Sequence, residues 1–128
     1  MHCLDTNIII DIFRGDEEVV EKVKLVVGEG EIFVTSISLC ELYKGAYGHI
    51  NSDDKLRIIE EFFDNANLVT LSIESSREFG LLWQNLKKKG KVISDFDILI
   101  ASMIKTENLT LITSDKHFRN LGINVIII

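Results

Sequence analysis

Acidic residues recur in this sequence where a short apolar run ends or where a helical pattern begins. Asp5 ends the run MHCLD, and Asp115 directly follows LTLITS. Glu41 lies in the apolar segment after EIFVTS, and Asp95 and Asp97 lie in SDFDILIAS. Carboxylates held side by side repel one another, raise one another's pKa and lower stability unless a cation neutralises them. Hard oxygen ligands with no imidazole or thiolate at this edge favour Mg²⁺ or Mn²⁺ over zinc, and such an ion can activate water for phosphodiester hydrolysis.

Each of these acids also has a plainer interpretation as a helix cap. The spacing Ser38-x-x-Glu41 matches a capping box, in which the acid reaches back to a free backbone N–H, and Ser94 and Asp97 have the same spacing. The two acids that follow strands could be N-caps or could interact with a helix dipole. Caps need no particular strand end, whereas these acids recur at strand ends with few basic residues in the same short segments. The sequence leaves both interpretations open.

Five β-rich runs alternate with longer segments in which apolar residues recur at helical spacing. The runs are MHCLD, EIFVTS, NLVTLS, LTLITSD and INVIII, and the apolar stripes cover residues 19–27, 39–46, 56–63, 79–86 and 98–104. Strands that are apolar almost throughout and alternate with helices predict a parallel sheet covered on both faces. We therefore expect an α/β fold, residues 1–128 forming a single domain with a central, mainly parallel sheet of four to five strands flanked by helices. Ligands of such sheets bind beyond the carboxyl ends of the strands, which would gather the acids at one edge.

Composition narrows the class of protein. A chain of 128 residues with 46% hydrophobic and 27% charged residues is typical of one globular domain. No apolar stretch approaches the roughly 20 residues of a membrane span, and Asp5 and Asp11 interrupt the first apolar run, so no signal peptide is predicted. Cys3 and Cys40 lie alone in apolar patterns and are expected to be buried free thiols. We expect a cytoplasmic protein without a membrane anchor.

The motifs LDTNIIID, SISLCELYKGA, SDFDILIAS and LITSDKHF resemble, in order, the successive motifs of the PIN domain, and specifically those of VapC-like ribonuclease toxins of type II toxin–antitoxin systems. The resemblance covers essentially the whole chain. It implies a metal-dependent endoribonuclease that leaves a 5′-phosphate and a 3′-hydroxyl. Asp5, Glu41, Asp97 and Asp115 fall on the family's acidic quartet, which holds Mg²⁺ or Mn²⁺ and the attacking water. Asp95 stands beside the quartet, either as a further metal ligand or as a residue that orients one.

The same resemblance suggests supporting residues. Thr6 and Asn7 fall on the polar pair after the first acid, and Thr113 or Ser114 falls on a polar position near the last. Gly45 fits a position expected to allow close helix packing.

An acidic chain with a net charge of −6 needs local cations to hold RNA. The candidate RNA-binding residues are Lys44, Lys89, Lys91 and Lys116, which lie near the acids in sequence. The lysine run also fits a solvated helix end with Gly90 after the last turn, and the two roles are compatible.

Partners and rival functions follow from the same residues. The resemblance implies a cognate VapB-like antitoxin that covers the acidic edge, and a homodimer. The segment GAYGHI, with Tyr47 and Ile50, beside a helix that contains Phe62 and Phe63, could leave an apolar patch exposed.

One rival function is a catalytically silent PIN-like binding module, although no quartet acid is missing. The other is a Mg²⁺-dependent phosphatase or receiver-type phosphoacceptor, against which stand Asn7, where a second acid is needed, and the single acid near the first strand.

Overall fold

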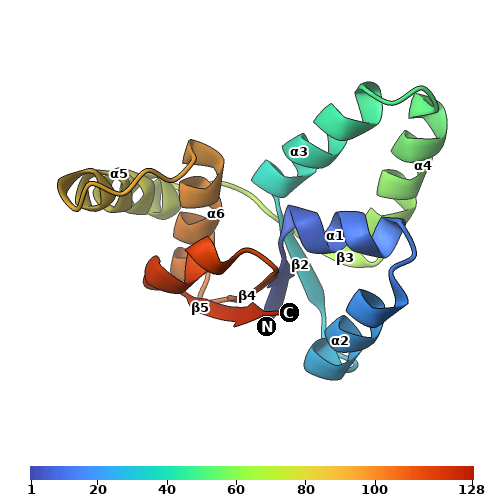
Figure 1. The fold of residues 1–128 in the computed structure, drawn as a ribbon, viewed down its shortest axis with the longest axis horizontal. Coiled ribbons are helices and arrows are strands. Elements are labelled where there is room, and N and C mark those ends of the chain that lie inside the picture. The colour runs from blue at the N-terminus through green and yellow to red at the C-terminus, as the bar shows by residue number, and fades with distance from the viewer.

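A computed structural model describes all residues, 1–128, and shows a central sheet with helices on both faces (Figure 1). The elements in chain order are β1 (His2–Leu4), α1 (Thr6–Phe13), α2 (Glu17–Val27), β2 (Ile32–Thr35), α3 (Ser36–Tyr47), α4 (Ser52–Phe63), β3 (Ala66–Val69), α5 (Ile73–Lys88), α6 (Asp95–Thr106), β4 (Thr110–Thr113), the 3₁₀ helix η1 (Lys116–Asn120) and β5 (Asn124–Ile127). The predicted α/β fold is confirmed. The sheet has five strands, and every strand pair is parallel rather than most of them. No helix combines the length and the apolar character that crossing a membrane requires.

The strand order is β3-β2-β1-β4-β5, which places β1 in the middle of the sheet. In this register Cys3 pairs with Phe33 of β2 on one side and with Leu111 of β4 on the other. The chain builds outward from β1 to β3, then crosses back to add β4 and β5, so the order reverses between β1 and β4. Ligand sites of open parallel sheets form at such a reversal. A receiver-type domain has the flavodoxin-like order 2-1-3-4-5 instead, which this sheet does not have.

Adjacent residues of each strand feed two separate cores because side chains alternate across a sheet. Cys3 and Leu111 face the core beneath α5, α6 and η1, whereas Leu4 and Ile112 face the core beneath α1 to α4. The predicted apolar stripes of the helices all pack into one of these two cores. Both cysteines are free; Cys3 is buried as predicted, but Cys40 is exposed because it lies on the outer side of α3.

The helix starts explain how two of the acids are presented. Thr35 caps α3 by accepting the backbone N–H of Ser38 at 3.1 Å, so this helix begins three residues earlier than a Ser38 cap would allow. The predicted capping box of Ser38 and Glu41 is therefore wrong, and the Glu41 carboxylate is free for other contacts. Ser94 does cap α6, accepting the backbone N–H of Asp97 at 3.2 Å, but the returning bond to the Ser94 backbone is absent.

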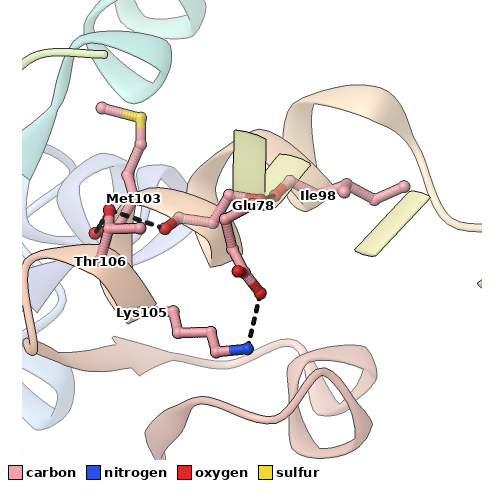
Figure 2. A network of polar contacts seen from close by, with 6 residues as sticks. Glu78, Ile98, Met103, Lys105 and Thr106 are labelled. Atoms are coloured by element: carbon pink, nitrogen blue, oxygen red, sulfur yellow. Dashed lines mark hydrogen bonds and ion pairs between the residues drawn. The ribbon is translucent and has the colours of Figure 1, made fainter. Parts of the chain in front are cut away.

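Helices α5 and α6 form a hairpin that sets the start of α6 above the sheet edge. Lys105 Nζ lies 2.6 Å from Glu78 Oε1 across this pair, and the Thr106 hydroxyl donates back to the carbonyl of Met103 at 3.3 Å (Figure 2). Partly exposed ion pairs of this kind contribute only about 0–1 kcal/mol. The shared core of α5 and α6, which includes Leu86 and Ile98, is therefore what fixes α6.

Candidate metal centre

Asp5 is the buried centre of the acidic group. It follows β1, caps α1, and is only 6% exposed. Its Oδ1 accepts the backbone N–H of Thr6 at 2.9 Å, and its Oδ2 accepts the hydroxyl of Thr113 at 2.7 Å. Burial, together with repulsion from Asp97 and Glu41, raises the pKa of Asp5 to about 6, although the two hydrogen bonds oppose this rise. Asp5 is thus both a helix cap and a member of a carboxylate group.

Thr6 connects Asp5 to the acid on α3. While its backbone N–H binds Asp5, its hydroxyl donates to Glu41 Oε1 at 2.8 Å. Glu41 is half-buried in the second turn of α3, a position set by the Thr35 cap. Helices α1 and α3 are therefore joined through two carboxylates and one threonine.

Thr113 connects Asp5 to the acid after β4. It is fully buried, and besides donating to Asp5 it accepts the backbone N–H of Asp115 at 3.0 Å. Ser114 is exposed and makes no side-chain hydrogen bond, so of the two polar residues predicted here the structure brings in Thr113. The distinction follows from strand alternation, because Thr113 faces inward and Ser114 does not.

Asp115 caps η1 and has an imidazole beside it. Its Oδ1 accepts the backbone N–H of His117 at 2.9 Å and lies 2.9 Å from Nδ1 of the same ring. The prediction of an edge free of imidazole is therefore wrong. The sequence offered no signal for this contact, because only the tight 3₁₀ turn brings His117 back over Asp115.

Asp97 completes the group from α6. It is half-buried in the first turn of that helix. Burial raises its pKa; a hydrogen bond from Ser94 opposes this rise, Asp115 raises the pKa further by repulsion, and His117 lowers it. Asp97 thus interacts with Asp5 on one side and with Asp115 on the other. The four acids of the predicted quartet meet as one electrostatic group.

Asp95 is not brought into this group. It is exposed on α6, and its Oδ1 accepts the indole N–H of Trp83 on α5 at 3.1 Å. Residues two apart on a helix do not share a face, so Asp95 and Asp97 point in different directions. The contact with Trp83 gives Asp95 a role in joining α5 to α6.

The donor set suits a hard cation, although the side chains are not closed around one point. No group of three or more His, Cys, Asp or Glu side chains is arranged to hold a metal ion. The carboxylates are instead turned toward local donors, namely Thr6, Thr113 and the His117 backbone. Asn7, two residues after Asp5, has the one buried side-chain oxygen without a hydrogen-bond partner. Carboxylate and amide oxygens are the ligands that Mg²⁺ and Mn²⁺ prefer, so the residues fit such an ion in type.

The predicted cationic residues lie at the surface. Lys44, Lys89, Lys91 and Lys116 are all exposed and form no ion pair. Gly90 follows the last turn of α5 with φ +68°, which confirms the helix-end interpretation of this segment. The side chains of the four lysines therefore remain free to contact an anion.

Gly45 is not a site of close helix packing, because a Cβ placed on it would meet no atom within 4 Å. It lines a cavity of about 280 Å³ that also touches Glu41 and Arg14. His49 and Lys55 line the same cavity. The sequence gave no signal for their convergence, since they come from a loop and from a separate helix.

Comparison with known proteins agrees with this architecture. The family model described as PIN domain matches residues 2–124. A Haemophilus influenzae protein named ribonuclease VapC2 is 30% identical over 115 residues, covering 89% of this chain and 86% of the relative. Another from the same species, ribonuclease VapC1, is 29% identical over 123 residues, covering 94% and 92%.

Solved structures show the same fold. VapBC2 from Rickettsia felis, bound to a DNA fragment from its promoter, superposes with a TM-score of 0.90 at 25% identity over 99% of this chain and 98% of that one. VapBC-1 from nontypeable Haemophilus influenzae gives a TM-score of 0.87 at 26% identity over 98% and 96%.

Proposed function

The chain belongs to the PIN domain family, and from this premise we propose that it is a metal-dependent endoribonuclease, the toxin of a toxin–antitoxin pair. The relatives named ribonuclease support the activity, and their similarity spans nearly the whole chain. One observation carries the assignment to this site: two threonines bind both oxygens of the buried Asp5 and link it to Glu41 and to the Asp115 backbone. A helix cap alone needs no such convergence of acids.

Asp5, Glu41, Asp97 and Asp115 would hold the ion, with Asn7 offering a further oxygen. Mg²⁺ or Mn²⁺ bound there would polarise a phosphoryl oxygen and lower the pKa of an attacking water. The chain's own contribution is placement. Asp5 is fixed by two hydrogen bonds, whereas the other three acids are less buried and can turn toward the ion.

Asp5→Asn tests this function in an RNA cleavage assay. The purified protein is incubated with transfer RNA or messenger RNA, with Mg²⁺ or with a chelator. We expect cleavage by the wild type only with the metal, and none by Asp5→Asn, because an amide is a weaker ligand and does not offset the ion's charge. Asp16→Asn is the matched control, because Asp16 also caps a helix, accepting the Val19 N–H at 3.2 Å, and lies outside the group. Metal-independent cleavage, or full cleavage by Asp5→Asn, would contradict the proposal.

We also propose a VapB-like partner that inhibits the site. The solved structures similar to this chain include VapBC complexes, and the acidic group focuses negative charge at the sheet edge. An Arg or Lys of a small partner could form charge-assisted hydrogen bonds there and exclude both metal and RNA. A tight complex without cleavage is the expected result of co-expression. A partner that binds and leaves cleavage unchanged would contradict this mode of inhibition.

A further inference from the structure

The cavity between α1, α3 and α4 has one apolar wall. This wall includes Ile10 and Phe13 from α1 and Ile59 from α4. The Phe13 ring packs edge-to-face on Phe62, with centroids 5.5 Å apart and an interplanar angle of 80°. That contact holds the Phe13 ring in place in the apolar wall. Figure 1 shows α1, α3 and α4 together on one side of the molecule.

The rest of the lining carries two cations beside Glu41, His49 and Gly45. Arg14 at the end of α1 and Lys55 in the first turn of α4 form no ion pair. His49 Nδ1 accepts the backbone N–H of Asn51 at 3.0 Å, so the neutral ring carries its proton on Nε2 and can donate from there. Two unpaired cations at one cavity are notable in a chain with a net charge of −6.

The cavity adjoins the acidic group through a single residue. Glu41 lines the cavity and also accepts the Thr6 hydroxyl beside Asp5. An RNA strand bound at the acidic group would therefore run beside the cavity, because Glu41 belongs to both. The volume of about 280 Å³ is near the lower end of small-molecule pockets, about 300–1,000 Å³, and suits one flat group.

We propose that this cavity binds one nucleotide of the RNA substrate next to the scissile phosphate. The base lies against the apolar wall with Phe13, and the phosphate contacts Arg14 and Lys55. This inference rests on the proposed ribonuclease function and adds to it a subsite that selects substrate. Apolar or aromatic contact with a base, together with cations along the backbone, is how single-stranded RNA is held in general.

Filling the cavity tests the proposal without disturbing the core. Gly45→Leu adds a side chain where a Cβ meets nothing within 4 Å, and leucine favours the helix more than glycine does. Gly80→Leu is the matched control, because Gly80 lies exposed on α5 with equal space and outside the cavity. Thermal melts establish that both variants fold.

Binding is measured by fluorescence anisotropy of a short labelled single-stranded RNA with Mg²⁺, in the cleavage-deficient Asp5→Asn background. We expect Gly45→Leu to weaken binding about fivefold or more, as loss of one base contact does, and Gly80→Leu to leave it unchanged. Equal affinity of the two variants, or no RNA binding by the background protein, would overturn the inference. Cleavage by the background protein, or none by the wild type, would instead refute the proposed function.

The contribution of Arg14 and Lys55 can be measured separately, from the salt dependence of RNA affinity. Each phosphate contact with single-stranded RNA contributes about 0.7 to the slope of log affinity against log salt concentration. Arg14→Gln and Lys55→Gln should each reduce that slope by about this amount. Arg57→Gln should not, because Arg57 on the same helix as Lys55 is already paired with Asp54 and Glu61.

A peptide occupant gives a different result. If Gly45→Leu prevents binding of a protein partner while RNA affinity and the salt slope stay at their control values, the cavity is a protein-docking site and the nucleotide subsite is refuted. The base contact can also be tested directly with a set of RNAs that each carry one abasic nucleotide at a different position. One abasic position should weaken binding to the Asp5→Asn protein, and Gly45→Leu should abolish that difference.

Discussion

Thr113 donates its hydroxyl to the buried carboxylate of Asp5 across 2.7 Å, although 108 residues separate the two in sequence. The bond joins the carboxyl ends of β1 and β4, which are neighbours in the sheet at the point where strand order reverses. It therefore ties the acidic group to the topology of the fold.

Thr113→Val tests this tie because it keeps the shape of the side chain and removes the hydroxyl. Asp5 and the Asp115 backbone N–H each lose a partner, so we expect a loss of about 1–3 kcal/mol in the free energy of unfolding at pH 7. The loss should shrink at acid pH, where Asp5 is protonated. Thr106→Val is the control, since Thr106 bonds only to carbonyls of its own helix. Equal effects of the two substitutions in chemical denaturation would contradict this role.

Asp5 should make the metal-free protein less stable as the pH rises. Its folded pKa of about 6 lies above the unfolded value of 3.8, so between these values the folded state holds a proton that the unfolded state has released. Stability from this group is fully present below pH 3.8 and is lost as the pH rises through 6, on the order of 3 kcal/mol in total. Urea titrations with a chelator should show this slope in the wild type and not in Asp5→Asn. Parallel curves for the two proteins would contradict it.

Asp97→Asn separates a metal ligand from a helix cap. The cap of α6 comes from the Ser94 hydroxyl and the Asp97 backbone N–H, which the substitution retains. We expect unchanged or higher thermal stability without metal and complete loss of Mg²⁺-dependent cleavage. Ser94→Ala should do the reverse, costing about 0.5–2 kcal/mol while the quartet remains. Retained cleavage in Asp97→Asn would refute its role as a ligand.

Asp95→Asn should leave metal affinity unchanged. The Asp95 carboxylate is exposed and accepts the Trp83 indole N–H, so an amide oxygen can take over that bond. Calorimetric titration with Mn²⁺ should give the same affinity as the wild type, whereas Glu41→Gln should weaken binding at least tenfold. A comparable loss in Asp95→Asn would place Asp95 among the ligands after all.

The end of α3 and the segment that follows it should mediate a homodimer. Tyr47 is 70% exposed and Ile50 is 95% exposed, but Phe62 and Phe63 are half-buried in the second core, so the exposed patch is smaller than the sequence suggested. Light scattering should give about twice the chain mass of 14.5 kDa, and Ile50→Asp should shift the protein toward monomer. Leu25→Asp, at a residue 83% exposed on α2, is the control. A single-chain mass for the wild type at micromolar concentrations would refute the dimer.

Local sequence patterns determined the secondary-structure elements and identified the candidate acidic residues. The apolar runs specify the strands, most clearly the central strands β1, β2 and β4, because a strand covered on both faces needs apolar side chains almost throughout. Helical periodicity specifies which residues enter the core, and Gly90 marks the end of α5 because a positive φ costs glycine little. Asp5 could be identified from the sequence because it ends a buried strand, where a charged side chain needs a partner.

The tertiary structure decided how these residues meet. The order of the strands depends on how the chain crosses over the sheet, and that order alone places Thr113 against Asp5. Helix starts also matter: α3 begins at Ser36 after the Thr35 cap, three residues earlier than a Ser38 cap would allow. Glu41 therefore lies in the second turn of α3, and its carboxylate is free to accept the Thr6 hydroxyl.

The cavity beside Glu41 is the feature that the sequence predicts least. Gly45, His49 and Lys55 belong to different segments, and nothing in their local sequence says that they face one another. Packing of α1, α3 and α4 creates this space because no side chain projects from Gly45 to fill it. Sequence periodicity can specify which face of each helix is buried, but the volume left between three helices depends on all of their side chains together.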